Sequence, residues 1–432
     1  MRDRSEHPSL TVKSGSISHV RLSSLHQWLL FGLVLATVTA VAGLAGFLIG
    51  RGQLSLMARG LAGTPPAQAQ RFLPFWEAWL KIERLFYSQQ PLDLTAMTYG
   101  AISGMLDSLH DPYAGFSTPP EHQMENEGFA GEFGGIGAWL ARDERGTYVA
   151  SLQPGSSAES AGLKTGDRVL TVADKEIGMA DLPSTTLLIR GPVPSTVHLV
   201  VERGGAELSF DIPRLVVERA SVQWSMASAA VGYVRILDFT GRTAHEFATA
   251  LAELAAADAR AMLLDLRGNG GGLASAAPGV LAQLVTGGIA YREVRSSGEE
   301  TRVAIPFAAT PPAPLPLAVL VDAGTASAAE IIAAAIQDYE RGPLIGTRTY
   351  GKGSVQGLFT LKDGSSIRIT TARWLTPHGR PVEGVGLQPE LIAQNDQEAL
   401  SLAKEYLANQ AGIVVESLRL PLPGDSDGKV LV

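Results

Sequence analysis

The sequence predicts a multidomain α/β protein that begins with one membrane-spanning helix. Three observations support this prediction. A stretch of 23 residues without a charge lies near the N-terminus, from Trp28 to Gly50. Short alternating strands dominate residues 131–213. Strands then alternate with helices over residues 221–390, which is typical of an α/β core with parallel strands.

Composition excludes several classes of function. The chain has 432 residues, of which 45% are hydrophobic and 18% charged, as in globular proteins of more than one domain. Its net charge of -8 argues against nucleic acid as a partner. It has no cysteine, which excludes thiol catalysis and disulfides. No HExxH motif and no GxxxxGK[ST] loop occurs, so we expect neither a metal nor another cofactor.

The apolar stretch Trp28–Gly50 is long enough to cross a bilayer as a helix. It is too long for the core of an ordinary signal peptide, so we expect an uncleaved signal anchor. Residues 1–27 would then be a cytoplasmic tail and residues 51–71 a linker. The large domains would lie outside the cytoplasm, at a bacterial inner membrane. The alternative is cleavage after the Ala-Gln-Ala sequence at residues 67–69.

A helical segment is predicted over residues 72–125. Apolar side chains recur at helical spacing over Pro74–Tyr87. A second helix is expected from Leu94 to Leu109 and ends before Pro112. Both helices are expected to pack against a core or against a second copy in a homo-oligomer.

Residues 131–213 resemble a PDZ domain. A GGIG turn stands where that family has its carboxylate-binding loop, and AGLKTGDRVLTV (Ala161–Val172) matches the segment from a short helix into a strand. The resemblance implies a β-rich domain that binds peptides with free C-termini. Consecutive loop N–H groups can converge on a carboxylate while the strand edge pairs with the peptide. The alternative is a PDZ fold that packs without binding peptide. The candidate peptide-binding residues are Gly134, Gly135, Ile136 and Gly137.

The region 221–390 contains the parts of an acyl-transfer site. Ser327 lies at an expected strand-to-helix corner, and Lys352 lies in a Gly-Lys-Gly turn. A glycine-rich turn, GNGGG, follows a buried strand and can present backbone N–H groups. Lysine can act as a base where burial lowers its pKa. The histidine nearest these motifs, His378, is expected in an exposed turn. The alternatives are a helix N-cap for Ser327 and a solvated turn for Lys352.

The order of four further motifs resembles that of the carboxyl-terminal processing proteases. DLRGNGGG, GTASAAEI, GKGSVQ and TPHGRPVEGVGLQPE follow the PDZ-like region, and the resemblance runs from Phe72 to Glu390. It implies an α/β core with parallel strands that resembles the crotonase-like fold. It also implies that Ser327 is the nucleophile, that Lys352 is the general base and that Gln356 orients this lysine.

The same resemblance implies an oxyanion hole made by the backbone N–H of Ala328 and of either Gly271 or Gly272. Asp338 matches an acidic position for which we expect a structural role. Three positions depart from the family pattern: Thr325 and Ala329 stand where serine is usual, and His110 stands where aspartate is usual. None of them removes a catalytic group, so we expect them to change the detailed geometry of the site rather than its activity.

The sequence therefore predicts a membrane-anchored serine endopeptidase that acts on envelope proteins from their C-termini. One alternative is a non-catalytic scaffold whose PDZ domain only holds protein tails. A more remote one is a crotonase-like acyl hydrolase, because a glycine-turn oxyanion hole also serves thioesters. The tail, residues 391–432, is expected to hold one amphipathic helix and is assigned no function.

Overall fold

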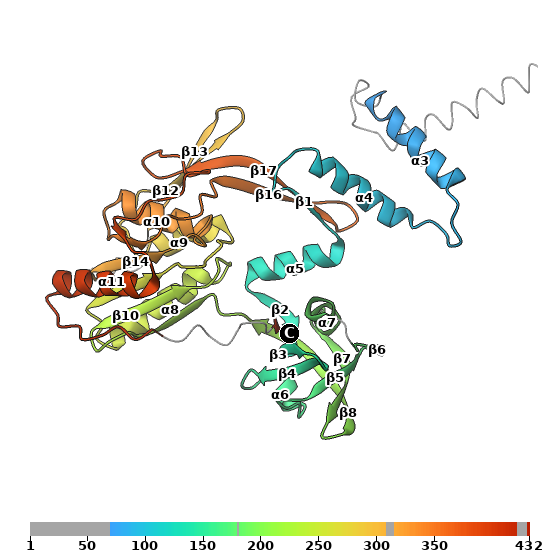
Figure 1. Ribbon diagram of the computed structural model, residues 1–432, viewed down its shortest axis with the longest axis horizontal. Helices are drawn as coiled ribbons and strands as arrows, with labels where there is room; N and C mark the ends of the chain where they lie inside the picture. Colours follow the sequence, from blue (N-terminus) through green and yellow to red (C-terminus); the bar gives the residue numbers. More distant parts are fainter. Residues whose placement is uncertain (1–69, 179–180, 308–314, 421–429) are drawn as a thin grey trace, which may run out of the picture. The chain divides into compact units, whose positions relative to one another are not determined.

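The computed structural model describes residues 70–178, 181–307, 315–420 and 430–432 (Figure 1). The predicted cytoplasmic tail, the anchor Trp28–Gly50 and most of the linker lie outside these residues. Within the described ranges, no helix is long and apolar enough to cross a bilayer. The chain divides into two compact units, with the boundary between Asp93 and Leu94.

The first unit contributes one described helix, α3 (Leu73–Leu85), which has no buried residue. The second unit begins with α4 (Leu94–Asp107). Both helices lie where apolar periodicity predicts them. The rest of the predicted helical segment differs, because residues 115–117 form a strand that pairs with a distant one, β17. The elements there are β1 (Gly115–Ser117) and α5 (Pro119–Ala130).

The PDZ-like region forms an antiparallel sheet in the order β19-β3-β4-β5-β7-β8-β2, with β6 beside β5. Alternate side chains of β7 point into its apolar core, so Val197, Leu199 and Val201 are buried. The C-terminal strand β19 joins this sheet, which the sequence does not predict. The elements are β2 (Glu132–Gly135), β3 (Ala138–Asp143), β4 (Gly146–Leu152), α6 (Ser157–Ser160), β5 (Arg168–Val172), β6 (Lys175–Glu176), α7 (Leu182–Ile189), β7 (Ser195–Arg203), β8 (Ala206–Glu218) and β19 (Val430–Leu431).

The α/β core is built on a second sheet in the order β18-β15-β14-β11-β10-β9. Its strands are parallel apart from β9, which is antiparallel to β10. The expected parallel core is thus confirmed. Its elements are β9 (Val222–Met226), β10 (Val231–Ile236), α8 (Thr243–Ala256), β11 (Ala261–Asp265), η1 (Ala274–Ala276), α9 (Ala277–Leu281), β14 (Leu317–Val321), α10 (Ala328–Asp338), β15 (Leu344–Gly346), β18 (Leu391–Ile392) and α11 (Asp396–Ala411).

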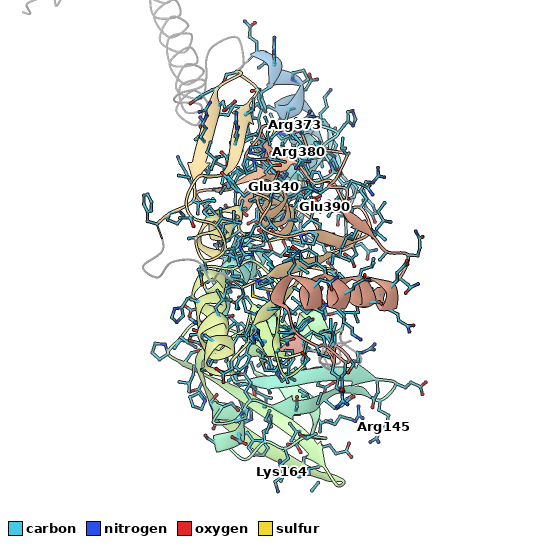
Figure 2. The ribbon with its side chains drawn as sticks, turned by 90° about the vertical axis from the view of Figure 1, so that its left-hand side faces the viewer. Arg145, Lys164, Glu340, Arg373, Arg380 and Glu390 are labelled. Atoms are coloured by element: carbon cyan, nitrogen blue, oxygen red, sulfur yellow. The ribbon has the colours of Figure 1, made fainter. Side chains whose placement is uncertain are left out.

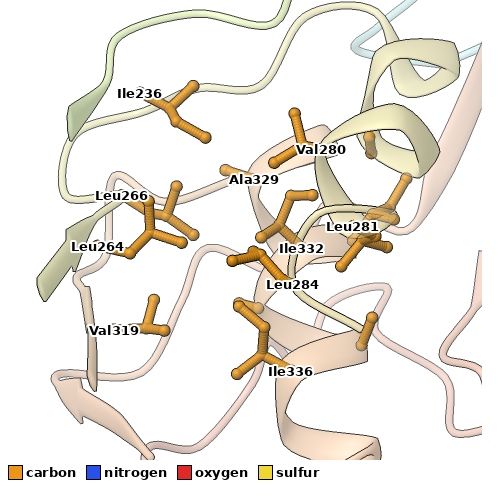
Figure 3. Packing of buried hydrophobic residues seen from close by; sticks show 14 of the residues in the cluster. Ile236, Leu264, Leu266, Val280, Leu281, Leu284, Val319, Ala329, Ile332 and Ile336 are labelled. Carbon is orange, nitrogen blue, oxygen red and sulfur yellow. The ribbon is translucent and has the colours of Figure 1, made fainter. Parts of the chain in front are cut away.

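Both faces of this sheet are buried, which explains why its strands read as continuous apolar runs. Side chains of β14 alternate between two clusters: Val319 packs with α9 and α10, whereas Ala318 and Leu320 pack with α11. Figure 3 shows Ile332 and Ile336 of α10 facing the sheet side chains. The rigid layer beneath α10 fixes where that helix begins.

A third sheet, in the order β1-β17-β12-β13 with β16 beside β17, holds the lysine motif. Strand β17 pairs with both β16 and β1, so the His-Asp-Pro-Tyr segment before β1 comes close to the loop before β16. The predicted hairpin strand over 364–377 is confirmed as β17. The elements are β12 (Ile289–Arg295), β13 (Glu300–Ala304), β16 (Ser354–Thr360) and β17 (Ser366–Leu375).

Candidate active site

Ser327 lies in the turn between β14 and α10. Its backbone φ of 55° and ψ of -119° are unusual for a residue other than glycine. Such strain is found at functional turns that expose one side chain. The preceding turn is held by Asp322, whose Oδ1 accepts hydrogen bonds from the N–H of Gly268 and of Gly324, both at 2.9 Å.

The glycine-rich loop lies against Ser327. It follows β11, the parallel neighbour of β14, so both loops leave the same edge of the sheet. The N–H of Ala326 donates to the carbonyl of Asn269 at 2.9 Å. A Cβ added to Gly271 would lie 2.7 Å from the Cβ of Ser327, so no larger residue fits here without displacement.

The two candidate oxyanion-hole glycines differ in their backbone N–H groups. The N–H of Gly271 donates to Oδ1 of buried Asn269 at 2.8 Å, and the amide of Asn269 donates to the carbonyl of Ile236. Within the described chain, the N–H groups of Gly272 and of Ala328 make no hydrogen bond. Their amides are therefore available, whereas that of Gly271 is already used.

A buried carboxylate, Glu330, joins the serine loop to the lysine loop, and the sequence analysis did not assign it. Its Oε2 accepts from the N–H of Ser327 at 3.0 Å and from the N–H of Lys352 at 2.9 Å. Its Oε1 accepts from the N–H of Gly351 at 2.8 Å and from the hydroxyl of Thr349 at 2.5 Å. The Ser-x-x-Glu spacing is the capping-box pattern and could have identified this residue.

Lys352 is held by its backbone, and its side chain points to a tyrosine. The indole N–H of Trp374 donates to its carbonyl at 2.9 Å. Its Nζ lies 4.7 Å from the ring centroid of Tyr113. Burial, and then the positive charge of Arg368, lower the pKa of Lys352, while Glu383 and Asp111 oppose this shift. In the part of the chain that the structure describes, no hydrogen bond joins Lys352 to Ser327.

The glycine turn of the PDZ-like region binds the end of the chain itself. The N–H groups of Gly137 and Ala138 donate to the carbonyl oxygen of Val432, at 2.7 and 3.0 Å. A Cβ on Gly135 would meet the carbonyl carbon of Val432 at 2.7 Å. Gly134 lies in β2, and Ile136 is fully buried in the domain core.

Comparison with known proteins agrees with this architecture. The model of peptidase family S41 matches residues 230–393, and a PDZ-domain model matches residues 148–203. Carboxy-terminal processing protease CtpA of Bacillus subtilis is 31% identical over 90% of this chain and 83% of its own length. The chain belongs to the carboxyl-terminal processing proteases.

Two further comparisons describe the same family. The chloroplastic C-terminal processing peptidase of Tetradesmus obliquus is 31% identical, over 78% of this chain and 76% of its own. A solved structure of a photosystem II D1 C-terminal processing protease has 32% identity and a TM-score of 0.43, covering 74% of this chain and 89% of that one.

Among the described residues of this member of the carboxyl-terminal processing proteases, Gln356 hydrogen-bonds to side chains other than that of Lys352. It lies on β16, where its amide Nε2 donates to the Ser354 hydroxyl at 2.9 Å and to the Thr370 hydroxyl at 3.3 Å. Within the described residues it makes no hydrogen bond to Lys352. Its predicted role in orienting the lysine stays a prediction.

Tyr113 was not singled out from the sequence, although its His-Asp-Pro-Tyr motif was. Burial, and then a hydrogen bond with Tyr350, raise the pKa of Tyr113 to about 12, so its phenol is neutral at physiological pH. Asp111 accepts from the N–H of Tyr113 at 3.0 Å and holds this turn. The N–H of Thr370 donates to the same carboxylate at 3.4 Å, which ties the turn to β17.

Asp338 makes structural contacts at the far end of α10. Its carboxylate pairs with Arg380 and accepts from the N–H of His378 at 2.7 Å. Glu390 accepts from the amide of Gln337 at 2.7 Å beside it (Figure 2). The side chain of His378 is 62% exposed in its turn, as the sequence predicts. No group of three or more metal-ligating side chains occurs among the described residues.

Proposed function

We propose that this chain is a membrane-anchored serine endopeptidase that cuts proteins near their C-termini with a Ser–Lys dyad. The observation that carries the proposal is the bonding of Glu330. One buried carboxylate binds the N–H of Ser327 and the N–H of Lys352, so the nucleophile and the base are fixed to the same anchor. The two loops are far apart in sequence, and the shared carboxylate holds the backbones of the proposed nucleophile and base close together.

The proposed chemistry uses both residues in turn. Neutral Lys352 takes the proton of the Ser327 hydroxyl, whose oxygen attacks the peptide carbonyl. The N–H groups of Gly272 and Ala328 stabilise the negative oxygen that forms. The lysine then gives its proton to the leaving amine, and water releases the acyl group. The side chain of Lys352 must swing from Tyr113 toward Ser327 for the first step.

Access to the site is proposed to depend on the PDZ domain. A free C-terminus bound at Gly137 raises the local concentration of its protein at the core. The domain is also proposed to hold the core closed until a substrate tail binds, because an open protease would damage neighbouring envelope proteins. The strand edge of β3 and the loop amides are the groups that PDZ domains use for such tails.

The anchor Trp28–Gly50 is proposed to hold the enzyme at the outer side of the bacterial cytoplasmic membrane. The protein is then expected to remain in the membrane fraction after carbonate extraction. Protease added to spheroplasts should degrade the PDZ and core domains. A soluble form that starts near Gln70 would contradict the anchor.

The dyad is tested on a denatured protein substrate. Ser327→Ala and Lys352→Ala are expected to lose roughly 10³- to 10⁶-fold in kcat. Lys352→Arg should be equally inactive, because guanidinium cannot give up its proton near neutral pH. Lys362→Arg, at an exposed lysine, serves as the matched control and should retain full activity. Activity in Lys352→Arg would disprove the dyad.

The alternative scaffold function makes the opposite prediction. A chain that only holds protein tails would bind a peptide with a free C-terminus and cleave nothing, with or without Ser327. Comparing peptide binding with peptide cleavage in the same preparation separates the two functions.

A further inference from the structure

We propose that the last three residues of this chain occupy its own PDZ groove and compete there with substrate tails. Figure 1 marks the C-terminus beside β2 and β3, at the predicted peptide-binding loop. The inference rests on the proposed function in one respect, since it takes this groove to be the binding site for substrate C-termini.

The backbone of the tail pairs as a peptide ligand would. Strand β19 runs antiparallel to β3, with Val430 opposite Leu140 and Leu431 opposite Trp139. The N–H of Val432 donates to the carbonyl of Ala138 at 2.8 Å. The oxygen of Val432 accepts from the loop N–H groups, as described above. This is strand addition with the chain end on a glycine loop.

The side chains of the tail fill apolar sites. Val432 is fully buried and belongs to the apolar core of the PDZ domain. Leu431 is 3% exposed and packs with Phe133, Val217 and Trp139. Helix α7 packs against both β3 and β19, so the tail lies in the groove between strand and helix. The groove therefore selects apolar residues at the last two positions of a C-terminus.

Arg190 provides a polar contact that depends on an occupant. Its Nη2 donates to the carbonyl of Leu431 at 2.7 Å, and its guanidinium stacks on Phe133, 3.6 Å from the ring centroid. Within the described residues this is the one hydrogen bond of the Arg190 side chain, and Nε has none. An empty groove would leave this half-buried guanidinium without its acceptor, which is unfavourable.

Tethering favours the chain's own tail over a free peptide. Nine residues, 421–429, separate the last three residues from Leu420. A ligand on a short tether has an effective concentration in the millimolar range. A free tail must displace it, so its apparent affinity should be weakened on the order of 10- to 100-fold. Proteins that are present at low concentration, or whose C-termini bind the groove weakly, would then escape cleavage.

The binding test uses the full chain with Ser327→Ala, so that no peptide is cut. A fluorescein-labelled peptide ending in Val-Leu-Val is titrated by anisotropy. Deletion of residues 430–432, and separately Val432→Asp, should tighten its binding about 10- to 100-fold. Val414→Asp is the matched control, because Val414 is 91% exposed and should leave affinity unchanged. Unchanged affinity in both tail variants would overturn the proposal.

Hydrogen exchange separates a competing ligand from a structural strand. The amides of Gly137 and Ala138 should exchange faster in the deletion variant and recover their protection with saturating peptide. Protection that does not recover would show that the tail is a structural element, and would overturn the proposal. An apparent peptide affinity of the intact chain that changes with protein concentration would also overturn the proposal. It would indicate that the tail of one copy binds the groove of another.

Cleavage gives an independent readout in the active protein. Deletion of residues 430–432 should raise kcat/KM for a tailed substrate about tenfold, because competition is removed. The binding assay does not depend on catalysis. If the chain with Ser327 intact cleaves no substrate, while the deletion still tightens peptide binding, the proposed protease function is disproved and this inference stands.

Discussion

The PDZ groove and the proposed catalytic centre differ in how complete they are. In the groove, the donors of Gly137 and Ala138 already bind an acceptor, and apolar side chains already fill the pocket. In the catalytic centre, the backbones of Ser327 and Lys352 are fixed by Glu330, yet the lysine amine lies over the ring of Tyr113. The groove is occupied by the end of the chain, whereas in the proposed catalytic centre the side chain of Lys352 must still turn toward Ser327.

The difference follows from what each site must hold. A peptide groove binds by main-chain hydrogen bonds and apolar burial, both of which the tail of the chain itself can supply. A Ser–Lys pair needs a neutral amine beside a hydroxyl, and a charged ammonium is better stabilised over an aromatic face. In the proposed mechanism, substrate binding completes the catalytic centre, whereas in the proposed competition a substrate tail must first displace residues 430–432 from the groove.

Apart from changes to the proposed dyad itself, the largest effect is expected from Glu330→Gln, which would break the common anchor. The amide NH₂ would face donors that now bind a carboxylate oxygen, such as the hydroxyl of Thr349 and the N–H of Gly351. We expect a loss of about 2–4 kcal/mol in the free energy of unfolding and roughly 100-fold in kcat. Urea unfolding and a peptide cleavage assay measure the two effects. Glu340→Gln, at an exposed glutamate, is the control (Figure 2).

Gly135→Val is expected to act on the groove alone. The added side chain would collide with the occupant at Val432 and with the ring of Phe133. Cleavage of tailed proteins should fall about tenfold, through KM, because tethering is lost. The domain is also proposed to hold the core closed. If it does, the cleavage rate of short peptides without a PDZ-binding tail should rise in this variant. Unchanged rates on every substrate would show that the domain has neither role.

Tyr113→Leu should free the lysine. The cation–π contact with the ring stabilises the charged, outward form of Lys352 by about 1 kcal/mol. Its removal should raise activity near neutral pH by roughly fivefold and move the acid limb of the pH profile to lower pH. A loss of activity would instead show that the aromatic ring positions the lysine for catalysis.

The smallest effect is expected from Arg368→Gln. The positive charge of Arg368 lowers the pKa of Lys352. Activity requires the neutral amine, so it rises as pH increases through this pKa. Without the charge the pKa rises, the profile moves to higher pH, and activity near neutral pH falls roughly threefold. Arg373→Gln, at an exposed position on the same strand, should leave the profile in place.

The sequence by itself predicts the order of the PDZ and peptidase regions and one edge of the proposed catalytic centre. Apolar runs predict the buried strands β11 and β14. The glycine-rich turn follows β11, and the turn that contains Ser327 follows β14. Neighbouring parallel strands bring such loops together, so the contact of Gly271 with Ser327 follows from pattern and topology. The PDZ loop is predicted from a resemblance to PDZ domains, which rests on local features: its glycines and the strand pattern that follows them.

Tertiary structure decided the contacts between distant segments. The strand order of the third sheet places Tyr113 at Lys352, across more than two hundred residues, and no local pattern encodes that pairing. The tail was assigned no function, because three apolar residues at a chain end carry no periodicity. Only folding brings residues 431 and 432 to the PDZ loop, where their main-chain oxygens accept hydrogen bonds from the loop amides and from the half-buried Arg190.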